Sequence, residues 1–223
     1  MSIAQNIAEI KKAIPDNVKL VAVSKTKPEE DILLAYHTGH RIFGENKAQE
    51  LTRKYEDLPK DIEWHFIGHL QSNKVKYIAP FVGLMHGVDS LKLLKVINKE
   101  ARKNERVIPC LLQFHIAREK TKFGLSREKA KDLLESEAYT KMKNVKIKGV
   151  MGMATYTDDM EMVRQEFRML KKIFEWLKVD YFADTTDFGE ISMGMSDDYR
   201  LAIEEGSTLV RVGSKIFGAR NYS

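Results

Sequence analysis

The chain has 223 residues, of which 43% are hydrophobic and 31% are charged. This length provides a core for one large domain or two small ones, and no apolar run reaches the ~18 residues of a membrane-spanning helix. The 37 basic and 32 acidic residues are interspersed, which disfavours a nucleic-acid-binding surface, whereas the net charge of +5 is compatible with a small phosphorylated ligand.

Cys110 is the only cysteine, and it lies in the apolar run "VIPCLLQF". A single cysteine cannot form an internal disulfide, so we expect a reducing, cytoplasmic location. The amino terminus also lacks the basic and then apolar pattern of a signal peptide. Because its neighbours are apolar, Cys110 is expected to be a small core residue rather than a catalytic thiol.

Helix-like and strand-like segments alternate along the chain. A capping box at Ser2 and Gln5 opens a helix, whose isoleucine stripe continues until Pro15. Apolar runs predict strands at 18–24, 41–43, 62–67, 84–88, 107–115, 145–153, 191–193 and 208–212. Amphipathic segments predict helices at 28–37, 45–55, 72–79, 91–103, 126–137, 160–177 and 197–206.

This alternation predicts the α/β class and a single (β/α)8 TIM barrel, with residues 1–223 as one domain and an extra N-terminal helix. An open, doubly wound parallel sheet is the competing architecture. Only ten residues follow Gly213, too few for a final helix of the usual ~11–12 residues. The N-terminal helix is therefore expected to cover the gap in the outer ring.

The first predicted strand ends at a lysine, in the stretch "VKLVAVSKTKP". Strand alternation places Val21, Val23 and Lys25 on one face. Since branched side chains fill the interior of such barrels, Lys25 is expected at the barrel mouth. A desolvated amine loses its proton more readily, and the neutral amine attacks an aldehyde or ketone to form a Schiff base. A surface lysine with its charged head in water is the alternative.

The eighth predicted strand brings a second set of polar groups, in "LVRVGS". Arg211 lies on the opposite face from Val210 and Val212, so it is expected to point inward, where a cation needs an anion or a fixed acceptor. Gly213 and Ser214 then offer backbone N–H groups and a hydroxyl at the habitual phosphate site of barrel enzymes. A tight turn and a structural ion pair are the alternative.

Four further polar residues lie at or near predicted strand ends. Ser192 and Ser196, in "ISMGMSDD", could donate hydrogen bonds to the same phosphate, although such a stretch also suits an ordinary helix start. Asn46 follows the second strand and His65 lies within the third. No metal site is expected, because no pair of potential ligands has convincing spacing. The sequence also contains no Ser-His-Asp motif and no glycine-rich dinucleotide motif.

Taken together, several stretches carry a resemblance to a known family. They are "VAVSKTKP", "FGENKAQE", "WHFIGHLQSNK", "KFG", "SMGMSDD" and "RVGSKIFGAR". Their order and spacing resemble those of the pyridoxal phosphate homeostasis proteins, which are similar to the N-terminal barrel of bacterial alanine racemase. The resemblance spans nearly the whole chain.

The resemblance implies that Lys25 carries pyridoxal 5'-phosphate (PLP) covalently as an internal aldimine, with Arg211 facing the pyridine nitrogen. It further implies a group of residues around the phosphate and the ring: Asn46, His65, Ser192, Ser196, Gly213 and Ser214. The chain departs from the family at Gln113-Phe114-His115 and in "GVMGMATYTDD", which lacks a following proline. Both stretches border the expected pocket, so its shape is expected to differ there.

An arginine beside the pyridine nitrogen keeps that nitrogen unprotonated, which makes the ring a poorer electron sink. The second domain of alanine racemase, which supplies a catalytic tyrosine across the dimer, has no counterpart in this sequence. We therefore expect no catalytic residues and a monomer. The expected function is to carry or buffer PLP, contributing to intracellular PLP homeostasis and amino-acid metabolism, with PLP-requiring apo-enzymes as partners and neither nucleic acid nor membrane.

Two enzymatic alternatives remain open. The first is a slow PLP-dependent amino-acid racemase, for which Tyr156 or His115 would supply the second acid–base group. The second is an aldolase without PLP, in which Lys25 forms a Schiff base with the substrate directly.

Overall fold

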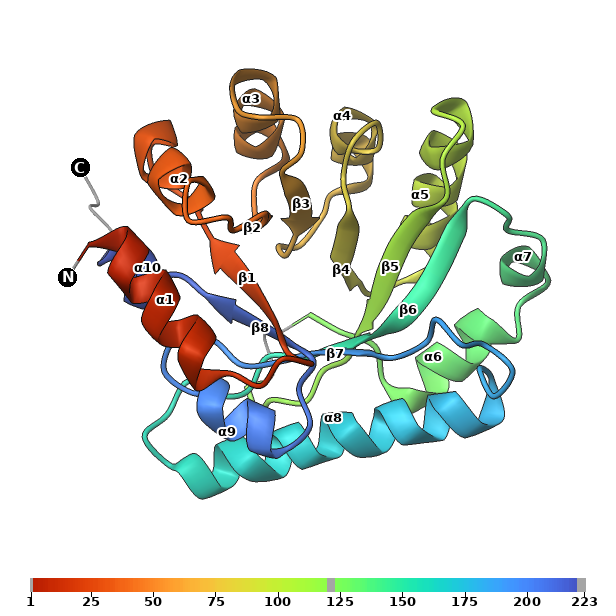
Figure 1. Cartoon of the computed structure of the whole chain (residues 1–223). Helices are drawn as coiled ribbons and strands as arrows, with labels where there is room; N and C mark the ends of the chain where they lie inside the picture. Colours follow the sequence, from red (N-terminus) through yellow and green to blue (C-terminus); the bar gives the residue numbers. More distant parts are fainter. Residues whose placement is uncertain (1, 120–122, 220–223) are drawn as a thin grey trace.

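The computed structural model describes residues 2–119 and 123–219 (Figure 1). In these ranges eight parallel strands form a closed barrel, in which each strand pairs with the next along the chain and β8 pairs back to β1. The strands are β1 (Lys19–Val23), β2 (Ile42–Glu45), β3 (Glu63–Phe66), β4 (Leu84–Val88), β5 (Ile108–Gln113), β6 (Val145–Met151), β7 (Glu190–Ser192) and β8 (Leu209–Val212). The predicted barrel is confirmed, and its closure excludes an open sheet.

Helices cover the outside of the barrel (Figure 1). They are α1 (Ile3–Ala13), α2 (Glu29–Tyr36), α3 (Ala48–Asp57), the 3-10 helix η1 (Ser72–Lys74), α4 (Val75–Ile78), α5 (Leu91–Lys103), α6 (Arg127–Leu134), α7 (Glu137–Thr140), α8 (Met160–Asp180), α9 (Tyr199–Glu204) and α10 (Ser214–Phe217). Apolar residues between the helices and the strands form the larger core, which contains Ala22, Val210 and Val212.

The opposite strand faces form a smaller apolar cluster in the barrel interior. Its buried members are Val21, Leu84, Leu111, Met151 and Leu209. Val21 lies beside Arg211 in the β1–β8 ladder. The alternation expected for the first and eighth strands is therefore confirmed, because Val21 and Arg211 share the inner face.

The extra N-terminal helix closes the outer ring, as expected. Ser2 and Gln5 form the predicted capping box of α1. The last helix, α10, has only four residues, and α1 packs against it and against α2 (Figure 1). The Asn6 side-chain amide donates a hydrogen bond to the Ile216 carbonyl at 2.9 Å. In the described part of the chain, the N-terminal helix thus covers the outer ring beside the four-residue α10.

Several predicted boundaries differ from those observed. The fifth strand ends at Gln113 rather than at His115, because the His115 N–H donates to the Leu125 carbonyl instead of continuing the sheet. The helix predicted over 126–137 is split, since Ser136 caps α7 by accepting from the Tyr139 N–H. The long helix α8 continues to Asp180, three residues beyond its predicted end.

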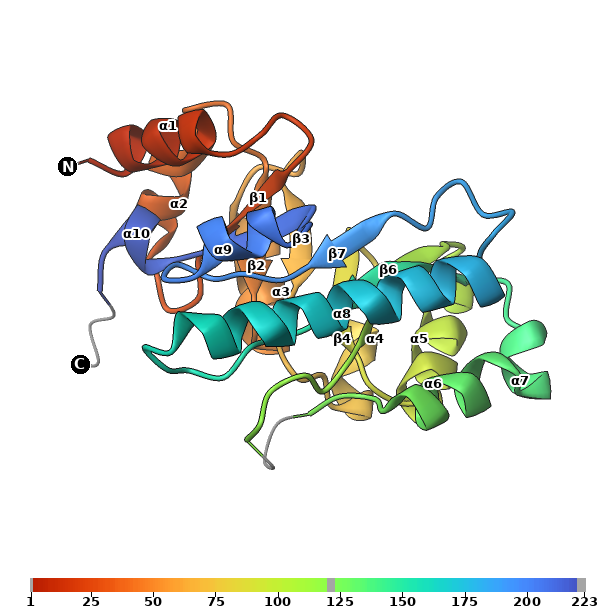
Figure 2. The same ribbon diagram turned by 90° about the horizontal axis from the view of Figure 1, so that it is seen from below.

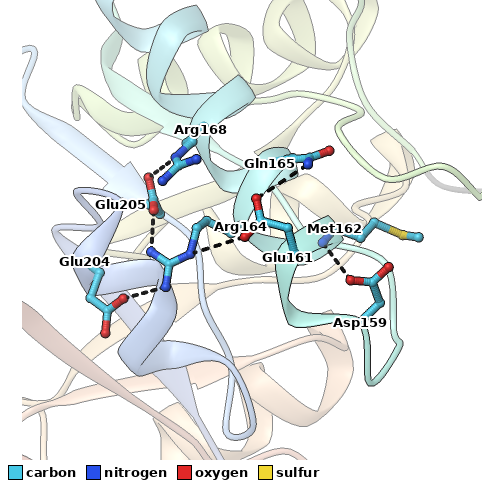
Figure 3. Close-up of polar contacts among 8 residues, drawn as sticks. All are labelled: Asp159, Glu161, Met162, Arg164, Gln165, Arg168, Glu204 and Glu205. Carbon is cyan, nitrogen blue, oxygen red and sulfur yellow. Dashed lines mark hydrogen bonds and ion pairs between the residues drawn. The ribbon is translucent and has the colours of Figure 1, made fainter.

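An ion-pair network fixes α9 against α8, which runs below β6 and β7 in Figure 2. Arg164 donates to Glu205 at 2.6 Å and to Glu204 at 2.8 Å, while Arg168 donates to Glu205 at 3.0 Å (Figure 3). At the start of α8, the Asp159 side chain accepts from the Met162 N–H. Because α9 follows the loop after β7, this network supports the loop that carries Ser196.

Replacing Glu205 with glutamine is expected to lower the free energy of unfolding by about 1 kcal/mol at pH 7, since one carboxylate joins two arginines. Burial acts to raise the pKa of Glu205, but hydrogen bonds from Arg164 and Arg168 outweigh it and lower that pKa below its usual value. The stabilisation is therefore complete above the ordinary glutamate pKa of ~4.3 and is lost as the pH falls through the lower pKa of the folded protein.

Urea unfolding of wild type and Glu205→Gln at pH 7 and at about pH 3 measures this difference. Glu137→Gln is the matched control, because the Glu137 side chain is 82% exposed and pairs with Lys141 only at the surface. The control is expected to match wild type at pH 7. A Glu205→Gln deficit that is equally large at both pH values would contradict the account.

Three further features concern the described residues. None of the helices in 2–119 and 123–219 is long and apolar enough to cross a membrane. Within the same ranges, no three His, Cys, Asp or Glu side chains are grouped so that they could hold a metal ion. Burial raises the pKa of the Cys110 thiol far above its usual value, which agrees with the predicted core position.

Candidate functional site

A cavity of about 460 Å³ opens at the carboxyl ends of the barrel strands. Six of the eight predicted site residues line it: Lys25, Asn46, Ser196, Arg211, Gly213 and Ser214. They come from the ends of β1, β2, β7 and β8, so the closed barrel brings together residues that are far apart in the sequence. His65 and Ser192 lie outside this lining.

Lys25 is half-buried in a turn directly after β1. The Lys27 N–H donates to the Ser24 carbonyl at 3.0 Å, which turns the chain away from the strand. Thr26 occupies the left-handed region with φ +63°, and its N–H donates to Glu50 Oε1 at 2.7 Å. These contacts fix the backbone on both sides of Lys25, so its side chain starts from a defined position at the cavity.

A buried ammonium group supports this turn. Lys54 Nζ donates to the Ser24 carbonyl at 2.8 Å and to Glu45 Oε1 and Glu50 Oε1 at 2.7 Å each. The side chains of Lys54 and Glu45 are fully buried, and burial raises the pKa of Glu45. Burial also acts to raise the pKa of Glu50, but its hydrogen bond with Lys54 outweighs this and lowers it. Lys54 thus ties β1, β2 and α3 together beneath Lys25.

Arg211 lies on the cavity floor and is only 4% exposed. Its Nη1 donates to Ser192 Oγ at 2.5 Å and its Nη2 to the Gly152 carbonyl at 3.1 Å. Burial lowers the pKa of Arg211 to about 10, which still leaves the side chain cationic at neutral pH. A guanidinium has five N–H donors, so others remain for an acceptor inside the cavity.

Gly213, Ser214 and Ser196 form a cluster of polar groups at one side of the cavity. The Gly213 N–H donates to Ser196 Oγ at 3.2 Å, and Ser214 begins α10. A Cβ at Gly213 would lie 3.2 Å from the Val23 carbonyl oxygen, so glycine lets the backbone after β8 lie close to the end of β1. Two hydroxyls and the backbone N–H groups at the start of α10 suit an anion with several acceptor oxygens.

His65 and Ser192 lie beneath Arg211, inside the barrel. Ser192 Oγ is 2.8 Å from His86 Nδ1, and His86 Nε2 is 3.0 Å from His65 Nδ1. Both predicted residues are thus placed next to the floor of the cavity rather than at its surface. His86 is a further buried residue of this group, and it was not among the predicted site residues. Its position two residues after Leu84, on the inner face of β4, was the available signal.

The ends of β5 and β6 shape the remaining rim. Gln113 lines the cavity and donates to the Phe123 carbonyl at 3.2 Å, whereas Phe114 is buried and His115 does not line the cavity. Tyr156 lines the cavity, with 87% of the residue exposed. Two residues of the quoted motifs, Lys122 of "KFG" and Arg220 of "RVGSKIFGAR", lie outside the described residues.

Comparison with known sequences gives a consistent result. The sequence pattern of the family described as "Alanine racemase, N-terminal domain" matches residues 1–221. The pyridoxal phosphate homeostasis protein of Aquifex aeolicus is 43% identical over 206 residues, covering 92% of this chain and 88% of that protein. The protein of the same name from Pasteurella multocida is 38% identical over 239 residues, covering both chains completely.

Solved structures give the same picture. PipY of Synechococcus elongatus without PLP superposes with a TM-score of 0.89 at 33% identity, covering 97% of this chain and all of that chain. The structure of the same protein with PLP bound has a TM-score of 0.86 at 32% identity, with the same coverage. Alanine racemase of Clostridium difficile, at 13% identity and a TM-score of 0.77, shares the fold over 57% of its chain.

Proposed function

The chain belongs to the pyridoxal phosphate homeostasis proteins, within the alanine racemase N-terminal domain family, and we propose that it holds PLP covalently on Lys25 and so buffers or delivers this cofactor. The main support for the proposal is that one cavity is lined by an amine (Lys25), a buried cation (Arg211) and an anion-binding cluster (Ser196, Gly213 and Ser214). Its volume of about 460 Å³ lies within the ~300–1,000 Å³ of small-molecule sites.

The residues present fit the chemical groups of the cofactor. Lys25 would hold the cofactor through its amine, which forms a Schiff base with an aldehyde while the aldehyde oxygen leaves as water. Ser196, Gly213 and Ser214 would hold the phosphate, and Arg211 would donate to the pyridine nitrogen. Asn46 would contact the cofactor from the end of β2. Ser192 and His65 act from beneath, through Arg211.

The same residues favour binding of the cofactor over catalytic turnover of a substrate. Bound PLP would supply an electron sink, but a cationic Arg211 beside the ring nitrogen disfavours protonation of that nitrogen and so weakens the sink. Carbanion chemistry then needs a second acid–base group, and Tyr156 at the cavity rim is mostly in water. We propose a monomeric, single-domain carrier that serves PLP-requiring apo-enzymes in the cytoplasm.

Loading of the purified protein tests the proposal. Protein incubated with PLP and then desalted is expected to retain one cofactor for each chain and to show the visible absorbance of a protonated imine. The physical reason is that the covalent bond, Arg211 and the phosphate cluster act on one ligand, which slows its release. Retention no greater than that of the unfolded chain would contradict the proposal.

The racemase alternative has one supporting observation, which is that Tyr156 lines the cavity. We expect the loaded protein to exchange the α-proton of alanine with solvent deuterium no faster than free PLP does. Proton NMR in D2O measures this rate. Exchange that is faster than that control and is lost in Tyr156→Phe would instead establish a slow racemase-like enzyme.

A further inference from the structure

A chain of hydrogen bonds crosses the barrel interior beneath the cavity. It runs from Arg211 Nη1 to Ser192 Oγ at 2.5 Å and on to His86 Nδ1 at 2.8 Å. It continues from His86 Nε2 to His65 Nδ1 at 3.0 Å and from His65 Nε2 to Glu63 Oε1 at 2.9 Å. Glu63 is the first residue of β3, so the chain links the cavity to the amino-terminal end of the barrel.

When each imidazole carries a single proton, the carboxylate end fixes the direction of the hydrogen bonds. A guanidinium only donates and a carboxylate only accepts. His65 therefore donates from Nε2 to Glu63, and its Nδ1 accepts from His86 Nε2. His86 Nδ1 is then an acceptor for the Ser192 hydroxyl, whose oxygen in turn accepts from Arg211. Both histidines are neutral in this arrangement, and each has a single tautomer.

Burial and charge agree with this assignment. Ser192 and His86 are fully buried and His65 is 1% exposed, whereas the Glu63 side chain is 53% exposed. Burial, and after it the positive charge of Arg211, lowers the pKa of His86 well below its usual value. The hydrogen bond from His65 lowers the pKa of Glu63, which keeps its carboxylate ionised. The chain therefore ends in a cation on the cavity side and an anion on the solvent side.

The surrounding structure makes room for this chain. A Cβ at Gly83 would lie 2.8 Å from Glu63 Cγ, so glycine leaves the space in which Glu63 reaches His65. The inner cluster of the barrel is otherwise apolar. Burying polar groups in such an interior costs free energy unless every one of them is hydrogen-bonded. The stability of the core therefore does not by itself explain why these hydrogen-bonded polar residues lie inside the barrel.

We infer a positioning role for four residues: Glu63, His65, His86 and Ser192. Through them, a carboxylate at the far end of the barrel fixes the guanidinium of Arg211 on the cavity floor. The step from Arg211 to the cofactor rests on the proposed function. The steps from Glu63 to Arg211 rest on the hydrogen-bond geometry alone.

Loss of the acceptor at Glu63 is expected to change the hydrogen bonding of Arg211 at the opposite end of the hydrogen-bond chain. Without it, His65 can carry its proton on either nitrogen, and in the reversed form His86 donates from Nδ1 toward Ser192. The Ser192 hydroxyl then loses its acceptor and becomes an unsatisfied buried donor. A rotation of Ser192 that relieves this cost removes one of the two acceptors that hold Arg211.

The first test uses the cofactor-free protein with 15N-labelled histidine and arginine. NMR of wild type is expected to show His65 and His86 neutral, with the proton on Nε2. Glu63→Leu is expected to give mixed tautomers at both histidines and faster hydrogen exchange at Arg211. Glu63→Gln, whose amide oxygen can still accept, is expected to match wild type.

Asp61→Leu is the control. Asp61 is a 55% exposed carboxylate just before β3, and it pairs with Arg41, which is not part of the hydrogen-bond chain. It is expected to leave both histidines unchanged. A proton on Nδ1 of His86 in wild type, or a Glu63→Leu spectrum in which His86 and Arg211 are unchanged, would overturn the inference.

The second test measures PLP binding by the same proteins. Glu63→Leu is expected to raise the dissociation constant about fivefold, which is the scale of one net hydrogen bond, and to shift the absorbance maximum of the bound cofactor. Glu63→Gln and Asp61→Leu are expected to match wild type. Unchanged PLP affinity in Glu63→Leu, despite altered tautomers, would overturn the positioning role. If wild type itself fails to bind PLP, the proposed function fails, while the NMR result decides the link to Arg211.

Discussion

Lys25→Ala is expected to abolish the visible imine band of the PLP-loaded protein and to speed the release of PLP at least tenfold. Lys25 follows β1 in a turn fixed by Thr26 and Lys27, and it lines the same cavity as Arg211. The remaining groups, Arg211 and the phosphate cluster, still bind PLP without a covalent bond, so weak binding is expected to persist.

Lys27→Ala provides the matched control, because Lys27 also lines the cavity. Its ammonium donates to the carbonyl groups of Phe217 and Ala219, both at 2.9 Å, which directs it toward the end of α10. Absorbance spectra after loading and desalting are expected to show the imine band in wild type and in Lys27→Ala only. A band that survives in Lys25→Ala and vanishes in Lys27→Ala would show that the covalent link is on Lys27 and not on Lys25.

Lys54→Met is expected to destabilise the fold by about 3–5 kcal/mol, the largest stability effect that we predict. Lys54 and Glu45 are fully buried, and Glu45 Oε2 accepts no hydrogen bond from the described residues. Removing the ammonium leaves a buried carboxylate without its counter-charge and frees the Ser24 carbonyl. The same change loosens the strand end before Lys25, so PLP loading should fall together with stability.

Urea unfolding compares Lys54→Met with Lys131→Met, whose lysine is 59% exposed and pairs with Glu135 at 4.0 Å. The control is expected to stay within about 0.5 kcal/mol of wild type. Adding Glu45→Gln to Lys54→Met removes the isolated charge and is expected to recover part of the loss. A Lys54→Met protein as stable as the Lys131→Met control would show that the buried ion pair does not support the strand end.

Much of the fold could be predicted from periodicity because the local signals agree with the tertiary structure. The strand from Leu84 to Val88 and the helix capped by Ser90 occur with the predicted bounds. Alternation also placed Val21 and Arg211 on the inner face, which the inner cluster and the β1–β8 register confirm. Errors fall at element ends such as His115, where a hydrogen bond to Leu125 from another segment replaces the sheet partner.

The supporting residues of the candidate site could not be predicted in the same way. Lys54 has the sequence context of a surface lysine on an amphipathic helix, and its burial depends on acceptors at the ends of β1 and β2. His86 likewise gains its partners, His65 and Ser192, from two other strands. Such contacts depend on strand register and barrel closure, which no local pattern specifies. Residues at strand ends were accessible to prediction because the barrel gathers them at one edge.

Reduction of the PLP-loaded protein with borohydride shows which side chain holds the cofactor, and we expect it to be Lys25. Borohydride converts a C=N bond into a stable amine, so mass spectrometry of proteolytic fragments locates the modified side chain. We predict one pyridoxyl phosphate group for each chain, on the fragment that contains Lys25 and at that residue. A group on Lys27 or on another lysine, or no stable modification of a protein that retains PLP, would contradict the account.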